Sequence, residues 1–246
     1  MITVLQLHPI KGLDPLQVNE ARVLASGALE FDRRWALMDG HGRFVNAKNR
    51  AEVHTIRAAY DLARMEVALD GHVFSLVREG GPIGQWFSDR LGEPVEWREN
   101  LELGFPDDTD SPSPTFISAA SVARVAEWFG LTVEEARRRF RTNVEFDGVE
   151  AFWEDRLYGS RFRAGDVEVD AINPCQRCVV PSRSALTGAQ DTGFQKRFAE
   201  LREAQLPSFA QRGPFTHYYR LAVNTRIPPS EAGKVIRVGD AVTFSS

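Results

Sequence analysis

The two cysteines of the chain, Cys175 and Cys178, lie three positions apart in the segment NPCQRCVVPS. Arg177 stands between them, and a neighbouring cation favours the thiolate, which is the form that binds metals and acts as a nucleophile. A lone CxxC pair could hold a zinc ion, run a dithiol redox cycle, ligate a metal that another group already holds, or consist of two inert buried thiols.

A structural zinc ion takes four ligands, usually from two such pairs or from one pair and two histidines. The chain has one pair, and its five histidines stand singly: His8, His41, His54, His72 and His217. A fold could still bring two of them to the cysteines, so a zinc-stabilised structural protein stays open. An iron–sulfur cluster needs four thiolates, so any such cluster has to come from a partner.

A dithiol redox centre normally sits at the start of a helix, whose dipole lowers the thiol pKa. The segment VVPS after Cys178 is not a helix start. Inert cysteines are usually buried among apolar residues, and the polar neighbours Gln176 and Arg177 do not favour such burial. An accessible thiolate at this position suits a soft metal that is held mainly by something else.

The elements that must position this pair are mostly strands. In the first hundred residues, Thr3 to Ile10 alternates as a half-buried strand does, and Gly40 to Gly42 and Asp70-Gly71 predict hairpin turns. A short helix is expected over residues 80–92. The Asp-, Ser- and Pro-rich segment 104–115 then predicts a linker or a surface loop. We therefore expect one domain over residues 1–103 and a second over residues 104–246.

The second half opens with two helices. Ser118 or Ser121 is the expected N-cap of the first, and Thr132 begins a capping-box pattern for the second. The arginine run 137–139 on that second helix could clamp a phosphate, but a solvated helix face is the preferred interpretation. Strands return after it, with one surface helix over residues 193–206. The fold class is therefore predicted to be mostly β with α additions (α+β).

Composition excludes several classes of protein. The chain has 246 residues, of which 43% are hydrophobic and 26% charged, and its net charge is −4. This is typical of a folded globular protein and not of a nucleic-acid binder, which usually has a basic excess. We found no apolar run long enough for a membrane span and no signal peptide, so a reducing cytoplasm is the expected location.

Six phrases of the sequence, in order, resemble proteins of the MOSC family, named for the C-terminal domain of molybdenum cofactor sulfurase. The phrases RFRTNVEFDG and FWEDRLYGSRFRAGDVEVDAINPCQRC look like the MOSC core. LHPIKGL and EFDRRWALMD are similar to the N-terminal β-barrel domain that precedes MOSC in the mitochondrial amidoxime-reducing component and its bacterial relatives. PFTHYYRL and IRVGDAV also fit. The resemblance implies a β-barrel-like N-terminal domain followed by a MOSC β-barrel domain.

The resemblance also implies a bound molybdenum cofactor (molybdopterin), a pterin dithiolene with a phosphate tail. Cys178 is then the expected metal ligand and catalytic residue. Residues at matching positions are expected to bind the cofactor: Lys11, Arg33, Ser111, Arg141, Asn143, Gln176, Arg177 and Tyr218. Ser113 lies in the same loop as Ser111. The alternatives are that Arg141 only pairs with a carboxylate such as Glu154 or Asp155, and that Tyr218 is a core aromatic.

By this resemblance the protein is an oxidoreductase that reduces small N-hydroxylated or N-oxide substrates by oxygen-atom transfer. It would take electrons from an external donor, such as a ferredoxin-like iron–sulfur protein or a flavoprotein reductase. The alternative is a sulfur-carrier or cofactor-delivery protein that uses a Cys178 persulfide. Some MOSC domains are fused to pyridoxal-phosphate-dependent sulfurases, and this chain shows no such domain.

The sequence departs from the family pattern at three places. Thr142 replaces the usual proline, and His8 replaces the tyrosine before Pro9. After Cys178 the usual threonines and Asp-Pro phrase give way to VVPSRSALTG. Because this loop borders the substrate side, the departure affects substrate identity more than cofactor binding.

Overall fold

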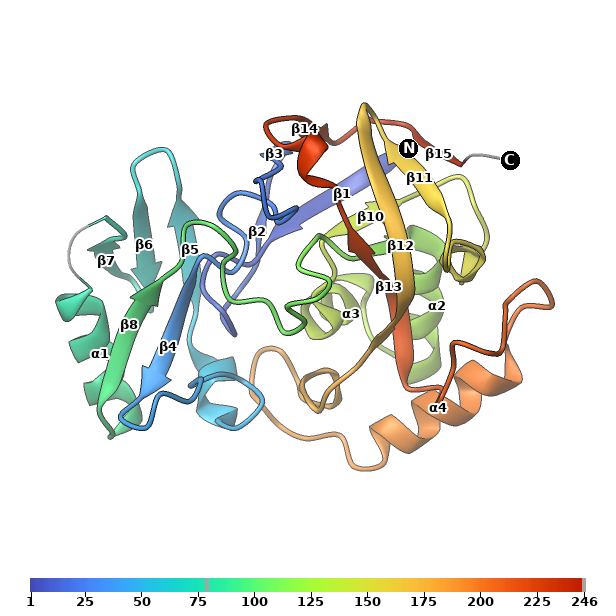
Figure 1. The fold of residues 1–246 in the computed structure, drawn as a ribbon. Coiled ribbons are helices and arrows are strands. Elements are labelled where there is room, and N and C mark those ends of the chain that lie inside the picture. The colour runs from blue at the N-terminus through green and yellow to red at the C-terminus, as the bar shows by residue number, and fades with distance from the viewer. Residues whose placement is uncertain (78–79, 245–246) are drawn as a thin grey trace.

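The computed structural model describes residues 1–77 and 80–244. Its elements form two groups, one with α1 and β4 to β8 and a larger one with the other strands and helices α2, α3 and α4 (Figure 1). The strands are β1 (Ile2–Leu7), β2 (Leu16–Gln17), β3 (Glu20–Arg22), β4 (Trp35–Asp39), β5 (Ala58–Asp61), β6 (Glu66–Leu69), β7 (His72–Ser75), β8 (Val95–Glu99), β9 (Phe116–Ser118), β10 (Val144–Phe146), β11 (Arg161–Ala164), β12 (Val167–Gln176), β13 (Arg220–Arg226), β14 (Val235–Arg237) and β15 (Val242–Phe244). The α-helices are α1 (Gly81–Leu91), α2 (Ala119–Phe129), α3 (Val133–Phe140) and α4 (Phe194–Ala204). Short 3-10 helices are η1 (Ala51–Thr55), η2 (Trp153–Arg156), η3 (Val180–Ser182) and η4 (Pro229–Glu231).

The larger group is built on an eight-stranded sheet with the order β15-β11-β12-β13-β9-β10-β1-β2. Its long strand β12 alternates buried and less buried side chains, so Val167, Val169 and Ala171 point into one core. The predicted α+β class is confirmed. A closed barrel is not found, because the edge strands β2 and β15 do not pair with each other in the described part of the chain. With only two residues, β2 is too short to carry the ladder round to β15.

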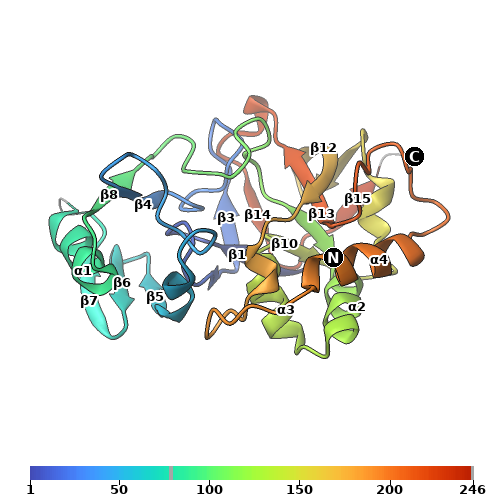
Figure 2. The same cartoon turned by 90° about the horizontal axis from the view of Figure 1, so that it is seen from below.

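Helices α2, α3 and α4 lie together at the end of the molecule away from α1 (Figure 2). The Ser118 hydroxyl accepts a hydrogen bond from the Ser121 amide, and the Thr132 hydroxyl accepts one from the Glu135 amide. Both bonds satisfy amides that have no partner within the helix, so α2 and α3 begin where the sequence predicts. Helix α3 ends at Arg141, whose φ of 52° is left-handed.

The smaller group has a hydrophobic core of its own. Trp35 is fully buried there and stacks on Trp97, with ring centroids 6.2 Å apart. The predicted turn at Asp70-Gly71 joins β6 to β7, and both residues have positive φ, 46° and 88°. A two-residue hairpin turn requires such angles, so this hairpin is confirmed.

The two groups do not follow the order of the chain. Strand β1 pairs with β10, and β3 pairs with β14, so the first strands lie in the larger group. The division at residue 103 stays a prediction. The predicted loop 104–115 contains no helix or strand, yet it buries Ser111 and Ser113. Within residues 1–77 and 80–244, no helix has the length and apolar character needed to span a membrane.

Candidate functional site

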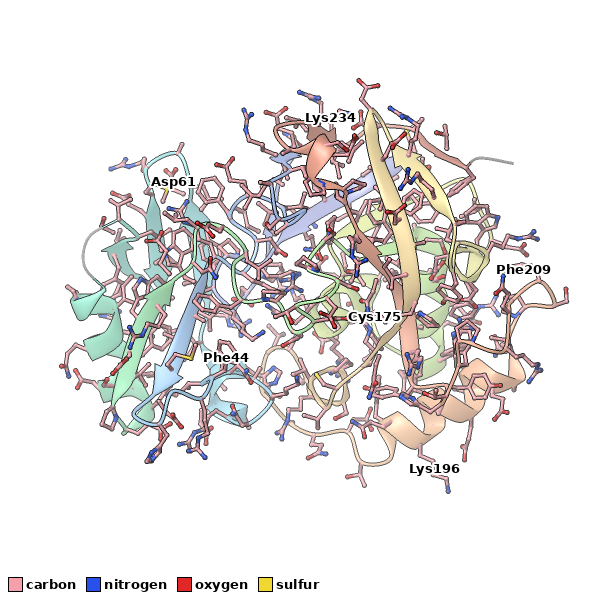
Figure 3. All side chains as sticks on the ribbon, in the orientation of Figure 1. Phe44, Asp61, Cys175, Lys196, Phe209 and Lys234 are labelled. Carbon is pink, nitrogen blue, oxygen red and sulfur yellow. The ribbon has the colours of Figure 1, made fainter. Side chains whose placement is uncertain are left out.

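A cavity of about 410 Å³ is lined by both groups of elements. Its walls come from stretches that are far apart in the sequence, namely residues 11–12, 46–48, 106–115, 139–143 and 175–181. The volume is within the usual range for sites that bind small molecules. Figure 3 labels one wall residue, Cys175, near the middle of the molecule between the two groups.

Both cysteines are free thiols and both line this cavity. Cys175 lies in β12, and the strand pairing continues past it, because the Arg177 amide donates to the Tyr219 carbonyl at 3.1 Å. Neither cysteine begins an α-helix, which is the position that lowers the thiol pKa in dithiol centres. Burial instead raises the pKa of Cys175. The structure therefore gives the dithiol redox alternative no support.

Arg177 is held in place by backbone carbonyls. Its Nε and Nη2 donate to the Leu221 carbonyl at 3.0 and 2.7 Å, and its Nη1 donates to the Phe140 carbonyl at 2.9 Å. The side chain lines the cavity and also ties the end of α3 to β13. It thus fixes a positive charge in the wall, where that charge acts on Cys175.

Arg141 leaves the end of α3 and also lines the cavity, and its Nη1 donates to the Leu13 carbonyl at 2.7 Å. The carboxylates considered as its partners bond elsewhere: Glu154 accepts from two serines, and Asp155 pairs with Arg202. The alternative that Arg141 pairs with one of them is therefore wrong. Among the described residues no carboxylate lies within ion-pair distance of its guanidinium.

The smaller group and loop 104–115 supply the opposite wall. Lys11 donates to Asp107 at 2.7 Å, and the Lys48 ammonium lies 3.9 Å from the same carboxylate. Arg33 forms an ion pair with its neighbour Asp32. Lys11, Arg33, Lys48 and Asp107 all line the cavity, so this wall carries charges of both signs.

Three more predicted residues lie in the cavity wall: Ser111, Asn143 and Gln176. The Asn143 amide is used internally, because its Oδ1 accepts from the Thr115 amide at 3.2 Å and its Nδ2 donates to the Gln6 carbonyl at 3.1 Å. Asn143 therefore ties β1 to the loop that covers the cavity, whatever else it contacts.

Tyr218 is the one predicted site residue that the structure does not bring to the cavity. Its ring stacks on Phe215 with centroids 5.6 Å apart, and its hydroxyl accepts a hydrogen bond from Arg212. The side chain packs against the core of the large sheet, as the alternative of a core aromatic predicts.

Four charged residues that line the cavity are not among the predicted site residues: Lys48, Asp107, Asp108 and Arg139. The sequence favours a solvated helix face for Arg139, but its side chain is 9% exposed and pairs with Glu135. That interpretation is wrong for Arg139, because its face of α3 turns toward the cavity. Its place at the start of the RFRTN phrase was a usable signal. Lys48 and Asp107 carry no local signal.

A zinc site finds no support. Within residues 1–77 and 80–244, no three side chains of His, Cys, Asp or Glu gather closely enough to hold a metal ion. The cysteine pair therefore has no histidine partners, and a metal at Cys178 would need most of its ligands from another molecule.

Comparison with known families gives two matches that together span most of the chain. The family model described as "MOSC N-terminal beta barrel domain" matches residues 1–76, and that described as "MOSC domain" matches residues 113–243. The match to the MOSC domain alone covers more than half of the chain.

Similar proteins include the molybdenum cofactor sulfurases of Caenorhabditis elegans and Caenorhabditis briggsae. They are 24% identical over 171 residues and 26% identical over 173 residues, covering 68% and 67% of this chain. The chain spans only 22% of each relative's length.

Similar solved structures include YiiM from Geobacillus stearothermophilus, with 15% identity, a TM-score of 0.37, and coverage of 55% of this chain and 54% of that chain. A crystal structure of a hypothetical protein covers all of this chain and 69% of its own, with 11% identity and a TM-score of 0.45. Structural similarity at these identities and TM-scores does not support any statement about function.

Proposed function

The chain belongs to the MOSC family, and on that premise we propose that it is a molybdenum-cofactor-dependent oxidoreductase. It binds the pterin cofactor in the cavity and reduces N-hydroxylated or N-oxide compounds by oxygen-atom transfer. The curated relatives are named for molybdenum cofactor sulfuration, which links the family to this cofactor but does not name the reaction of this chain.

One observation carries the proposal. The thiol of Cys178 lines the same cavity as Arg33 from the smaller group and Arg141 from the larger one. A soft sulfur ligand and two guanidinium groups are what a metal with an anionic organic ligand requires. Had Cys178 been packed in the core, or had the arginines faced other surfaces, the proposal would have no site.

The charges of the cavity also fit an anionic cofactor. Among the described residues, two carboxylates line the cavity, Asp107 and Asp108. Six cations line it: Lys11, Arg33, Lys48, Arg139, Arg141 and Arg177. This positive excess suits the phosphate tail and the dithiolene sulfurs of the pterin.

The residues of the chain would hold and orient the cofactor, while the bound molybdenum would supply the two-electron oxygen-atom chemistry. Cys178 would be its protein ligand. Arg177, fixed by three hydrogen bonds to carbonyls, keeps a positive charge beside that anionic centre without having to reorganise.

The overall conversion takes two electrons and two protons, removes the oxygen as water and releases the reduced amine or amidine. The electrons have to come from outside the chain. We propose a ferredoxin-like iron–sulfur protein or a flavoprotein reductase as the donor, because the sequence has no flavin or nucleotide fingerprint and only two cysteines.

The test is to make the protein in a host that synthesises the cofactor and to measure molybdenum, pterin fluorescence and benzamidoxime reduction with an artificial donor. We expect molybdenum and activity in the wild type and loss of both in Cys178→Ser. Cys175→Ser is the matched control, since it removes the other thiol of the same cavity. Full metal content and activity in Cys178→Ser would overturn the ligand assignment.

A sulfur-carrier role is the second candidate, favoured by the names of the matched relatives and by the access of Cys178 to the cavity. Here Cys178 would carry a persulfide and the chain would not turn over a substrate. Mass spectrometry of the isolated protein separates the two functions. One additional sulfur atom on Cys178 without bound pterin supports the carrier, and bound pterin with an unmodified Cys178 supports the reductase.

A further inference from the structure

The Lys11 ammonium is enclosed on several sides. Its Nζ donates to Asp107 at 2.7 Å and to the Phe105 carbonyl at 2.8 Å, and it lies 4.9 Å from the centre of the Phe44 ring. Figure 3 labels Phe44 on the side of the smaller group. The Lys11 side chain is 7% exposed, so its charge depends on these contacts.

The two partners of this ion pair differ in their access to water. While Lys11 is buried, the Asp107 side chain is 63% exposed. Partial desolvation opposes the ionisation of Asp107, but Lys11 outweighs it and, with Lys48 and Arg33, lowers the pKa of Asp107 to about 2. The carboxylate is therefore charged at any ordinary pH and can leave toward solvent.

Lys11 cannot leave in the same way. Separating a buried ammonium from its counter-ion is costly unless another anion takes the place of that counter-ion. An external anion that arrives at Lys11 and Lys48 meets the two cations that now lie 2.7 and 3.9 Å from Asp107, and the charge of Arg33 acts on it from further away. Exchange of one anion for another keeps Lys11 neutralised throughout, so it costs little.

We propose that Asp107 is an exchangeable internal counter-ion: its carboxylate occupies the anion position formed by Lys11 and Lys48, with Arg33 in the same cavity wall, and a phosphate group of the ligand displaces it. The inference rests on the proposed function for the identity of the ligand. It adds to that function a residue, Asp107, that competes with the ligand phosphate for the same cations. Asp107 then determines which anions bind. A monoanion has little more electrostatic attraction to these cations than the carboxylate that it replaces, while a phosphate dianion is attracted more strongly by all three cations.

The exchange needs only the Asp107 side chain to move. The loop around it is fixed on both sides, since the Phe105 amide donates to the Arg33 carbonyl at 2.8 Å and Arg226 donates to the Asp110 carbonyl at 2.8 Å. We therefore expect loop 104–115 to keep its path when the carboxylate swings out.

The test is calorimetric titration of the whole protein, without pterin, with inorganic phosphate at low ionic strength. Asp107→Asn removes the competing charge and should bind phosphate about fivefold more tightly, the equivalent of one exposed ion pair. Asp108→Asn is the matched control, because Asp108 lines the same cavity and no described cation pairs with it. Its affinity for phosphate should change less than twofold.

The site of binding is checked by adding Lys11→Met to Asp107→Asn, which should abolish the gain. The proposal is overturned if Asp107→Asn binds no more tightly than Asp108→Asn, if the gain survives Lys11→Met, or if no variant binds phosphate. Because these titrations use no cofactor, their failure leaves the metal test of Cys178 standing, and loss of that metal test leaves the exchange measurable.

Discussion

Two ion pairs of the molecule have cations that are largely hidden from water, and the main difference between the pairs is the exposure of the carboxylates. At the cavity, Lys11 pairs with Asp107, whose side chain is 63% exposed. Between α4 and η2, Arg202 pairs with Asp155, and both side chains are 1% exposed. The first pair can exchange its anion with the solvent, and the second cannot. An ion pair between a cation and a carboxylate thus prepares a binding site at one place and stabilises the fold at the other.

The interior pair belongs to a larger network. The Arg202 guanidinium lies 4.1 Å from the centre of the Phe152 ring, and Asp155 also accepts a hydrogen bond from the Tyr158 hydroxyl at 2.6 Å. Next to it, Glu154 accepts from the Ser121 hydroxyl at 3.0 Å. This network joins η2 to α2 and α4 without reaching the cavity.

Asp155→Asn should have the largest effect of the changes that test this contrast. It leaves the Arg202 charge buried without its counter-ion, which costs about 3–5 kcal/mol in the free energy of unfolding. Urea unfolding followed by fluorescence measures the loss. A loss below 1 kcal/mol, as for a surface pair, would remove the distinction between the two regions.

Arg177→Lys tests a third way of holding a cation, here a half-buried one, by carbonyl groups alone. Lysine keeps the charge but cannot reach both the Leu221 and Phe140 carbonyls with a planar fork, so the unfolding free energy should fall by about 2 kcal/mol. The same urea experiment applies. An unchanged unfolding free energy would mean that the positive charge stabilises the fold and that the planar geometry of the guanidinium adds nothing.

Glu154→Gln tests the interior network through pH. Burial, helped by Asp155, raises the pKa of Glu154 from 4.5 to about 7. The folded state thus binds the proton more tightly than the unfolded state, so the wild type loses stability as pH rises from about 4.5 to 7. Glutamine cannot ionise, and the variant should gain on the order of 1–3 kcal/mol over the wild type across that window. A difference between the two proteins that is flat from pH 4 to pH 8 would contradict this assignment.

Asp107→Asn should have the smallest effect on stability, less than about 1 kcal/mol. The amide oxygen can still accept from the Lys11 ammonium, which keeps its hydrogen bond to the Phe105 carbonyl, and a buffer anion can reach the exposed position that the carboxylate leaves. The difference between the two ion pairs is supported if this variant has the unfolding free energy of the wild type and a higher affinity for phosphate. If instead it loses as much stability as Asp155→Asn, Asp107 is a structural anchor and not an exchangeable ion.

Several features could be predicted because their causes lie within a few residues of one another. The caps at Ser118 and Thr132 and the turn at Asp70-Gly71 depend on local hydrogen bonds and on positive φ. The order of the short phrases was enough to indicate the MOSC family, which the family models confirm. The same phrases placed Cys178, Arg33 and Arg141, which the structure brings to one cavity.

Packing between distant segments decided the rest. Lys11 and Asp107 meet across 96 positions, and no spacing rule connects them. Pairing of β1 with β10 puts the start of the chain in the larger sheet, and the turn of α3 brings Arg139 into the cavity wall. Local sequence fixes the direction of a side chain relative to its own element, while the contacts that it makes depend on which other elements pack beside it. The sequence by itself therefore determined the family and the thiol with its arginines, and the tertiary structure decided how each charge of the cavity is neutralised.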